Sequence, residues 1–360
     1  MDQVRVMIVE DSPTVREYLR QAISADARLA VVAECESAEQ ALASLDRAAP
    51  DVISMDIHLP RMSGLEATRR IMETCPTPIV IVSRSVNAQE LDSTMDALRA
   101  GAVSAVEAPS CQQPGRLPDA AARICRELAV MSQIRVVRQR FNHARSQSVA
   151  RLPRVPEPIG VATKPGDRRA SLVGIVASTG GPHAVETILA TIGSDYPIPI
   201  VLVQHITASF HSGFISWLNR ISPLLVTEAQ HGELPQPGQV YVAPSDKHLL
   251  VRSNRLVLDD GPPVCGQRPS GTVLLRSMAD SMGSHAVGVV LTGMGNDGAE
   301  GLLAIRHAGG YTIAEDESTA VVNGMPEAAR VLDAPCVSLP LESIGTAIRH
   351  LVPLPQEVCA

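Results

Sequence analysis

The sequence has few aromatic residues, only two lysines and no paired cysteine motif, and these scarcities exclude several classes of protein. Aromatic side chains make up 2% of the 360 residues, too few for a base-stacking nucleic-acid surface or an aromatic belt at a membrane. The seven cysteines are scattered and include no C-x-x-C pair, which indicates reduced thiols rather than disulfides or zinc ligands. We therefore expect aliphatic cores without covalent or metal crosslinks.

Long apolar runs are also missing. No run approaches the ~20 residues needed to span a bilayer, and no basic-then-apolar leader is recognisable. The net charge of -7, with 19% charged residues, is unfavourable for bulk binding to nucleic acid. The sequence therefore predicts a cytoplasmic protein that neither inserts into a membrane nor binds nucleic acid.

Short apolar runs alternate with amphipathic stretches in both halves of the chain, which predicts βα units on parallel sheets. The expected strands are Val4–Val9, Leu29–Glu34, Asp51–Met55, Pro78–Val82 and Val103–Val106, then Leu172–Ala177, Ile198–Val203, Val240–Ala243 and Ala286–Leu291. The fold class is therefore α/β, with a five-stranded parallel sheet in residues 1–133 and a second, doubly wound α/β domain in residues 171–355.

Residues 134–170 differ from both flanking regions. They contain nine basic residues and only two acidic ones. Four prolines in the second half prevent a regular helix, so we interpret this stretch as a basic linker. A solvated tether is the simpler interpretation, and a docking surface for acidic helices of a partner, involving Arg135, Arg138 and Arg140, is the alternative.

Three carboxylates follow predicted strands of the first domain. Glu10 and Asp11 come after Val4–Val9, and Asp56 comes after Asp51–Met55. The carboxyl ends of parallel strands converge on one crevice, and clustered hard oxygen ligands suit Mg²⁺. On spacing alone, helix capping explains these residues equally well.

The wider motifs of this half resemble response-regulator receiver domains. They are Val9-Glu10-Asp11-Ser12, the stretch from Met55-Asp56 through His58 to Gly64-Leu65-Glu66, and Val82-Ser83. The resemblance implies that Asp56 accepts a phosphoryl group, that Glu10, Asp11, Asp56 and the His58 carbonyl bind Mg²⁺, and that the Ser83 hydroxyl contacts the phosphoryl group. A histidine kinase is the implied phosphodonor.

This half departs from the receiver pattern at two positions. Ala108 stands where receivers carry a lysine before proline, and Ala105 stands where an aromatic switch residue is usual. Both lysines of the chain, Lys164 and Lys247, lie outside this domain, and Arg84 is one candidate surrogate cation. We therefore expect phosphorylation of Asp56 to be coupled weakly to conformation.

In the second domain, three predicted strands end at residues with catalytic chemistry. Ser178 follows Leu172–Ala177 at the start of a Gly-Gly-Pro turn, His205 follows Ile198–Val203, and Asp297 follows Ala286–Leu291. If these strands are parallel neighbours, the three side chains can form a nucleophile, a base and an orienting carboxylate. The alternatives are a helix-capping serine, a packed histidine and an ordinary Asn-Asp-Gly turn. The remaining histidines, His248 among them, are interpreted as surface or packing residues.

These motifs resemble the catalytic domain of the chemotaxis protein-glutamate methylesterases, the CheB family. The matching segments are Ala177-Ser178-Thr179-Gly180-Gly181, Gln204-His205, Arg268-Pro269-Ser270, Leu291 to Ala299 and Gly324-Met325-Pro326. The resemblance implies a Ser178, His205 and Asp297 triad, with an oxyanion site supported by the Met294 N–H and the Thr179 region and no cofactor for the esterase. It also implies methylated chemoreceptors as substrates, release of methanol, deamidation of receptor glutamines, and a receiver that blocks the site until Asp56 is phosphorylated.

The second half departs from the family pattern at three positions. Gly271-Thr272 replaces a common Val-Asp pair, and Gln267 stands where histidine is frequent, so substrate binding or packing is expected to differ.

The chain order Ser, His, Asp argues against a lipase-type hydrolase. A transcription regulator is disfavoured because no basic recognition helix is evident. A non-enzymatic signalling adaptor remains the main alternative.

Overall fold

The computed structural model describes residues 3–83, 88–108, 117–134, 136 and 170–351. The chain divides into two compact units, Met1–Arg145 and Ser146–Ala360. The division falls within the predicted linker, 134–170, most of which lies outside the described residues. Arg84, Arg135, Arg138 and Arg140 lie outside them as well. Each unit is described by itself below.

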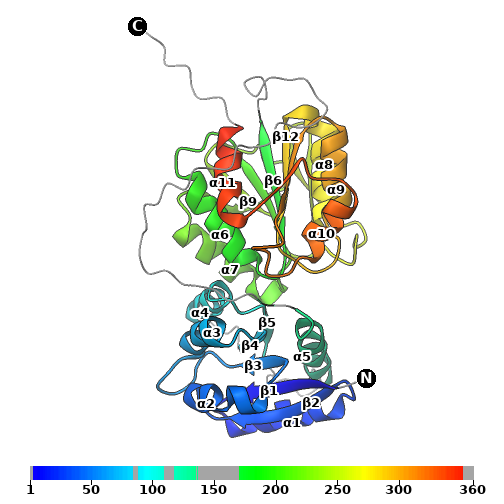
Figure 1. Ribbon diagram of the computed structural model, residues 1–360. Coiled ribbons are helices and arrows are strands. Elements are labelled where there is room, and N and C mark those ends of the chain that lie inside the picture. Colours follow the sequence, from blue (N-terminus) through cyan, green and yellow to red (C-terminus); the bar gives the residue numbers. More distant parts are fainter. Residues whose placement is uncertain (1–2, 84–87, 109–116, 135, 137–169, 352–360) are drawn as a thin grey trace. The chain divides into compact units, whose positions relative to one another are not determined.

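The first unit is a five-stranded parallel sheet covered by helices (Figure 1). Its strands are β1 (Val4–Val9), β2 (Leu29–Cys35), β3 (Val52–Met55), β4 (Ile79–Ser83) and β5 (Ser104–Glu107), in the order β2-β1-β3-β4-β5. Its helices are α1 (Pro13–Ala25), α2 (Ala38–Ala48), α3 (Gly64–Thr74), α4 (Ala88–Arg99) and α5 (Leu117–Met131). Helices α1 and α5 pack together, whereas α2, α3 and α4 form a second layer.

Local sequence features account for the buried strands and for where two of the helices begin. All residues of β3 and β4 are buried, which accounts for their predominantly apolar sequences between helices. Two of the helices begin at serine caps: Ser37 accepts a hydrogen bond from the Gln40 N–H, and Ser63 accepts one from the Glu66 N–H. These caps end the preceding loops at the edge of the sheet where the acidic residues gather.

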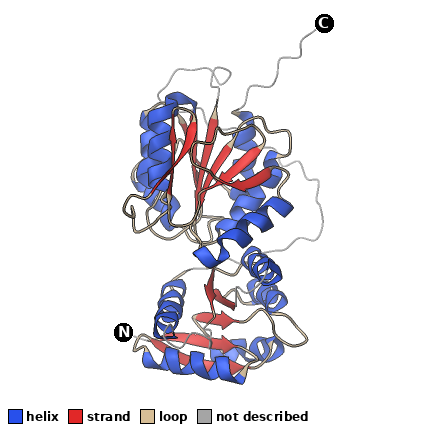
Figure 2. Ribbon diagram, turned by 180° about the vertical axis from the view of Figure 1, so that it is seen from behind, coloured by secondary structure: helices blue, strands red, loops and turns tan. Residues whose placement is uncertain are grey.

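The second unit is a seven-stranded parallel sheet with helices on both faces (Figure 2). Its sheet strands are β6 (Leu172–Ala177), β7 (Ile200–Gln204), β8 (Leu225–Glu228), β9 (Gln239–Val242), β12 (Ala286–Val290), β13 (Tyr311–Glu315) and β14 (Val337–Leu339), in the order β14-β13-β12-β6-β7-β9-β8. A separate antiparallel pair joins β10 (His248–Arg252) to β11 (Arg255–Asp259).

Six α-helices cover this sheet. They are α6 (Gly181–Ile192), α7 (Ala208–Ile221), α8 (Gly271–Met282), α9 (Ala299–His307), α10 (Gly324–Val331) and α11 (Leu341–His350), with a short 3₁₀ turn at Gly283–His285. Helices α6, α7 and α11 lie on one face, and α8, α9 and α10 lie on the other (Figure 1). None of the helices in the described part of the chain has both the length and the apolar character needed to cross a bilayer.

The α/β fold class predicted for both halves is confirmed, whereas the expectation of purely aliphatic cores is wrong for the second unit. Phe210, Phe214 and Trp217 on α7 and Tyr241 on β9 are fully buried. The Phe214 and Trp217 rings stack with their centroids 6.2 Å apart. Half of the eight aromatic residues of the chain are therefore fully buried in the second unit.

Candidate active site and acidic pocket

Three adjacent strands of the second unit carry the predicted nucleophile, base and orienting carboxylate. Strand β6 pairs in parallel with β12 on one side and with β7 on the other. Ser178 follows β6 directly, His205 follows β7 directly, and Asp297 lies in the turn between β12 and α9. The condition on which the prediction depended, parallel neighbouring strands, is therefore met.

Ser178 lies in a tightly held turn between β6 and α6. Its N–H donates to the Thr292 carbonyl over 3.0 Å, and its carbonyl accepts from Gln204 Nε2 over 2.8 Å. The residue that caps α6 is Gly180 rather than Ser178, so the helix-capping alternative does not explain the serine. A Cβ on Gly293 would lie 2.7 Å from the Ser178 Cβ, which shows how closely the loop after β12 approaches the nucleophile.

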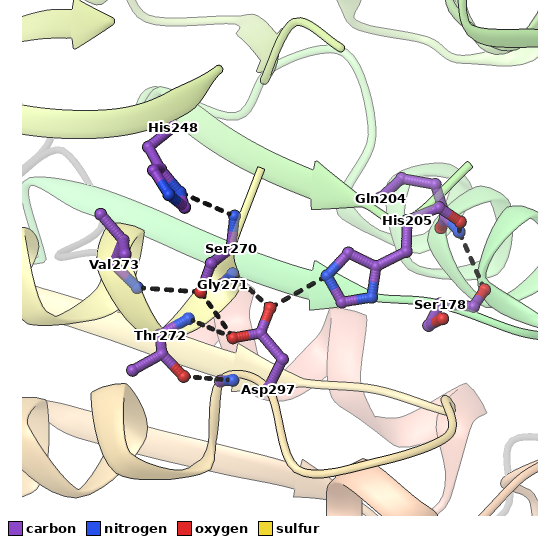
Figure 3. A network of polar contacts seen from close by, with 10 residues as sticks. Ser178, Gln204, His205, His248, Ser270, Gly271, Thr272, Val273 and Asp297 are labelled. Carbon is purple, nitrogen blue, oxygen red and sulfur yellow. Dashed lines mark hydrogen bonds and ion pairs between the residues drawn. The ribbon is translucent and has the colours of Figure 1, made fainter. Parts of the chain in front are cut away.

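One ring nitrogen of His205 is hydrogen-bonded to Asp297, and the other has no hydrogen-bond partner among the described residues. Its Nε2 lies 2.9 Å from Asp297 Oδ2, and both side chains are buried. The Nδ1 atom is buried without a hydrogen-bond partner in the described protein. Figure 3 shows Ser178 on the side of the imidazole opposite Asp297. The Ser178 hydroxyl and His205 form no hydrogen bond here, and such catalytic bonds commonly tighten only when substrate binds.

The beginning of α8 holds the Asp297 carboxylate in a cradle of donors (Figure 3). Oδ1 accepts from the Ser270 hydroxyl at 2.7 Å and from the Thr272 N–H at 3.0 Å. Oδ2 accepts from the Gly271 N–H at 2.6 Å, in addition to His205. A helix N-terminus supplies unsatisfied N–H groups and a favourable dipole for an anion. The Thr272 hydroxyl also accepts from the Gly298 N–H at 2.8 Å and so fixes the turn that carries Asp297.

These donors keep Asp297 ionised although it is buried. Burial by itself would raise the pKa of Asp297, but the hydrogen bonds from His205, Ser270 and Thr272 outweigh that effect and lower the pKa to about 2. The carboxylate therefore carries its charge at neutral pH and accepts the His205 Nε2–H. The tautomer that leaves Nδ1 free as a base is favoured by this arrangement.

His248, predicted from the sequence to be a surface or packing residue, is a buried residue that also supports the Asp297 site. It is buried at the start of β10, where its Nδ1 accepts from the Ser270 N–H at 3.2 Å and its Nε2 lies 3.0 Å from the Pro262 carbonyl. It thereby fixes the residue that donates to Asp297 (Figure 3). The contact between Ser270 and His248 joins residues 22 positions apart, and that between Ser270 and Asp297 joins residues 27 positions apart, so the sequence alone does not reveal either.

The departure at Gly271 has a steric explanation. A Cβ at this position would lie 2.1 Å from Cγ1 of Val176, a fully buried residue of β6. Val176 therefore occupies the space that a side chain at position 271 would need. The glycine allows its N–H to approach the Asp297 carboxylate without displacing β6.

Exchanging these two residues should preserve stability where either single change does not. We expect Gly271→Val to lower the free energy of unfolding by at least about 2 kcal/mol through overpacking. Val176→Gly should also destabilise, by leaving a cavity. The variant carrying both changes should recover most of the loss, as measured by thermal unfolding of all three proteins. Strictly additive losses would contradict the steric explanation.

The predicted oxyanion residues lie around Ser178 with free main-chain donors. Neither the Thr179 N–H nor the Met294 N–H donates to an acceptor within the described residues. Met294 follows Gly293, which packs against the Ser178 Cβ, and its own side chain is 49% exposed. Two free N–H groups beside a nucleophile are the donors that an oxyanion requires.

The first unit brings its predicted acidic residues together. Glu10, Asp11 and Asp56 each offer a carboxylate oxygen, and these oxygens lie within 4.8 Å of one another. Burial raises the pKa of Asp56 above its usual value, and the neighbouring Asp11 adds to this, while hydrogen bonds from the His58 and Ile57 N–H groups oppose it. Three clustered hard oxygen ligands in a partly buried setting fit Mg²⁺.

Ser83 is the last residue of β4, and Ala108 directly follows β5. The Ser83 hydroxyl is buried and has no hydrogen-bond partner among the described residues. The Ala108 N–H donates to the Ser83 carbonyl at 2.9 Å, so the main chain at position 108 lies next to Ser83. Ala105 is partly exposed on β5. The role of the His58 carbonyl as a metal ligand stays a prediction.

Comparison with known proteins agrees with both folds. Residues 173–348 match the CheB methylesterase family, and residues 6–119 match the response regulator receiver domain. A protein-glutamate methylesterase/protein-glutamine glutaminase of Paramagnetospirillum magneticum is 50% identical, covering 97% of both chains. One from Geobacter metallireducens is 41% identical, covering 97% of this chain and 99% of its own.

Solved structures are also similar to each unit. The Thermotoga maritima CheB methylesterase catalytic domain is 35% identical and covers 51% of this chain and 99% of its own, with a TM-score of 0.49. The response regulator domain of Thermotoga maritima CheB is 28% identical and covers 37% of this chain and 99% of its own, with a TM-score of 0.34.

Together, the sequence matches and the two folds define a response regulator whose output domain has the architecture of a methylesterase. Over 97% of its length the sequence follows that of full-length relatives. The chain belongs to the CheB family of protein-glutamate methylesterases. The alternative of a non-enzymatic adaptor is not favoured by these matches.

Proposed function

We propose that this protein hydrolyses glutamyl methyl esters on chemoreceptor helices, releasing methanol, and that it deamidates receptor glutamines at the same site. The observation that carries the proposal is the asymmetry of His205: its Nε2 is bonded to an ionised carboxylate, and its buried Nδ1 is unpartnered on the side of Ser178. An imidazole in this state can act as a general base, because its free nitrogen can accept the proton of a hydroxyl group.

The proposed reaction begins with attack by Ser178. As the Oγ atom bonds to the ester carbonyl carbon, its proton passes to His205 Nδ1, and Asp297 stabilises the imidazolium through Nε2. The negative oxygen that develops on the carbonyl accepts hydrogen bonds from the Thr179 and Met294 N–H groups. Collapse of this intermediate breaks the bond to the methoxy group, which takes the proton from Nδ1 and leaves as methanol.

Water completes the reaction by the same route. His205 Nδ1 removes a proton from the water as its oxygen attacks the glutamyl ester of Ser178. The Ser178 Oγ leaves with that proton, and the receptor glutamate is released as a carboxylate. For a glutamine substrate, the first leaving group is ammonia. The proposed chemistry uses only protein groups and water.

Methanol release from methylated receptor membranes tests this function directly. The full chain should release methanol with saturation kinetics and a rate proportional to enzyme concentration. Mass spectrometry of the receptor should show glutamate at the former ester positions. A protein that binds the receptor but releases no methanol would establish the adaptor alternative instead.

In the receiver, Mg²⁺ would be held by Glu10, Asp11 and Asp56, with the His58 carbonyl as a further ligand. The ion supplies positive charge that offsets the charge of an incoming phosphoryl group. Asp56 would accept the phosphoryl group, and the buried, unpartnered Ser83 hydroxyl would donate to one of its oxygens. A histidine kinase is the proposed physiological donor.

Phosphorylation should stimulate the esterase only weakly. Moving a two-state switch from 1:99 to 99:1 requires about 5.5 kcal/mol, and Ala108 removes the ammonium that would pair with the phosphoryl group. We expect a stimulation of less than about tenfold when acetyl phosphate and Mg²⁺ are added, measured as the initial rate of methanol release. A larger stimulation that disappears in Asp56→Asn would show that another group replaces the lysine.

The domain boundaries belong to the same proposal. A receiver over residues 1–133, a basic linker over 134–170 and a catalytic domain over 171–355 agree with the family matches at residues 6–119 and 173–348. Receptor helices and the kinase of a chemotaxis pathway would place the protein in the cytoplasm.

A further inference from the structure

A buried carboxyl group lies behind the nucleophile and is not part of the proposed triad. Glu315 ends β13, and its side chain is fully buried. Its Oε2 accepts from the Thr292 N–H at 2.8 Å, and its Oε1 lies 3.1 Å from the Thr319 hydroxyl. A buried carboxyl group is costly to a fold, so its contacts bear directly on what it does there.

Thr292 connects this carboxyl group to the nucleophile. The Thr292 carbonyl accepts from the Ser178 N–H at 3.0 Å. Its hydroxyl donates to the Thr179 carbonyl at 2.8 Å and accepts from the Val322 N–H at 2.9 Å. The N–H of the same residue is the group bonded to Glu315. Each polar group of Thr292 therefore has a hydrogen-bond partner. A shift of the Thr292 main chain would change the position of Ser178.

The charged groups around Glu315 do not neutralise it. Burial is the largest cause that raises the pKa of Glu315 to about 7, and the nearby acidic side chains of Glu342 and Asp316 contribute to this rise. Arg330, from α10, bonds the main-chain carbonyl of Glu315 at 3.0 Å rather than its carboxylate. The Thr292 N–H and the Thr319 hydroxyl oppose the rise.

The two charge states of Glu315 bind Thr292 differently. As a carboxylate it accepts charge-assisted hydrogen bonds from both the Thr292 N–H and the Thr319 hydroxyl. As a carboxylic acid it can donate to the Thr319 oxygen, whose own proton then turns to the Asp316 carbonyl, 3.4 Å away. The bond to Thr292 is then a neutral one, and neutral hydrogen bonds are weaker.

We propose that Glu315 is a positioning residue for Ser178, acting through the Thr292 peptide, and that its carboxylate form holds the nucleophile turn more firmly than its acid form. The proposal rests on the proposed esterase function. The side chain is fully buried and does not meet the substrate, so its effect should fall on the turnover number and not on KM.

Glu315→Gln tests the proposal because it keeps the shape of the side chain and an acceptor for Thr292 but carries no charge. We expect kcat for methanol release by the full chain to fall about fivefold at pH 8.5, with KM unchanged. The ratio of parental to variant kcat should approach one near pH 5.5, where Glu315 is protonated. Both proteins retain His205, so the ratio cancels the titration of the base itself.

A matched control and a second variant keep the test decisive. Glu342→Gln removes an exposed acidic neighbour that does not bond Thr292, and it should keep the parental kcat at pH 8.5. Thr319→Val removes the hydroxyl at Oε1, so the pH at which kcat rises should shift upward, which gives a readout if Glu315→Gln does not fold.

The failure of this inference is separable from failure of the function. A Glu315→Gln protein that matches the parent at every pH, or differs from it by a constant factor, overturns the positioning role. If the parental chain releases no methanol from methylated receptor membranes, the proposed function has failed instead. A pH-dependent ratio together with Ser178-dependent release supports both.

Discussion

Ser178→Ala is expected to lower kcat for methanol release by about 10⁴–10⁶-fold while leaving the fold intact. Loss of a serine nucleophile removes the covalent route entirely, and only binding and the oxyanion donors then accelerate direct attack by water. The structure explains why stability should not change. The contacts that hold this turn use the Ser178 N–H and carbonyl, which alanine retains, whereas the hydroxyl is not required as a helix cap.

The measurement is methanol release by the parent and the variant at saturating receptor, with thermal unfolding recorded on the same samples. Ser281→Ala is a matched control, because Ser281 lies on α8 about 15 Å along the helix from its first residue, and its hydroxyl donates to the Val251 carbonyl. It should retain parental activity. A Ser178→Ala protein with activity within tenfold of the parent would rule out this serine as the nucleophile.

The strands that position the site could be predicted because they are buried on both faces. Strand β6 was predicted at its observed bounds, and β7 and β12 within two residues, since parallel strands under helices consist of continuous apolar runs. The sequence therefore also indicated which polar residues follow those strands. Boundary differences, such as β4 beginning at Ile79 instead of Pro78, are of the size that frayed ends produce.

Elements with mixed composition were not predicted. Strand β13 contains a threonine and a glutamate, and the β10–β11 hairpin lies outside the main sheet. The hairpin did carry a sequence signal, because the pair Ser253-Asn254 separates the apolar segments 249–251 and 256–258. In the structure both turn residues adopt positive φ, as a two-residue type I′ turn requires. Strand β14 has only three residues, and only Val226 of β8 is buried, so neither strand gives a continuous apolar run.

The supporting contacts of the site could not be read from the sequence, for a physical reason. Residue type and strand order indicate which side chains reach the edge of a sheet, but they do not indicate which ring nitrogen of His205 faces Asp297. Nor do they reveal that Ser270 and His248, on other elements, complete the carboxylate cradle, or that Val176 accounts for Gly271. These features depend on side-chain rotamers and on the approach of α8, which only the folded structure determines.

Asp297→Asn should damage both activity and stability, because no orientation of an amide satisfies the α8 cradle. If the amide nitrogen takes the place of Oδ2, this nitrogen faces two other donors, the Gly271 N–H and the His205 Nε2–H. With the nitrogen in place of Oδ1, it faces the Thr272 N–H. In either orientation a buried main-chain donor loses its acceptor, at a cost of about 1–3 kcal/mol.

The stability loss should depend on pH in a direction set by the pKa of Asp297. That pKa is lowered in the fold to about 2, so the carboxylate contributes stability above its unfolded pKa of about 3.9, and this contribution is lost as pH falls toward 2. The deficit of Asp297→Asn in the free energy of unfolding should therefore be full at pH 7 and should shrink below pH 4. Asp195→Asn, which removes only an exposed partner of Arg349, is the matched control and should show almost no deficit.

The catalytic loss should be about 10⁴-fold in kcat, because the amide also permits the wrong imidazole tautomer. If the amide carbonyl does not face Nε2, His205 is stable with its proton on Nδ1, the nitrogen that must accept the proton of Ser178. Methanol release measured across pH would then stay low throughout, since raising the pH does not restore an acceptor at Nδ1. A variant within tenfold of the parent at any pH would mean that Asp297 fixes neither the tautomer nor the ring, and that the α8 cradle serves folding alone.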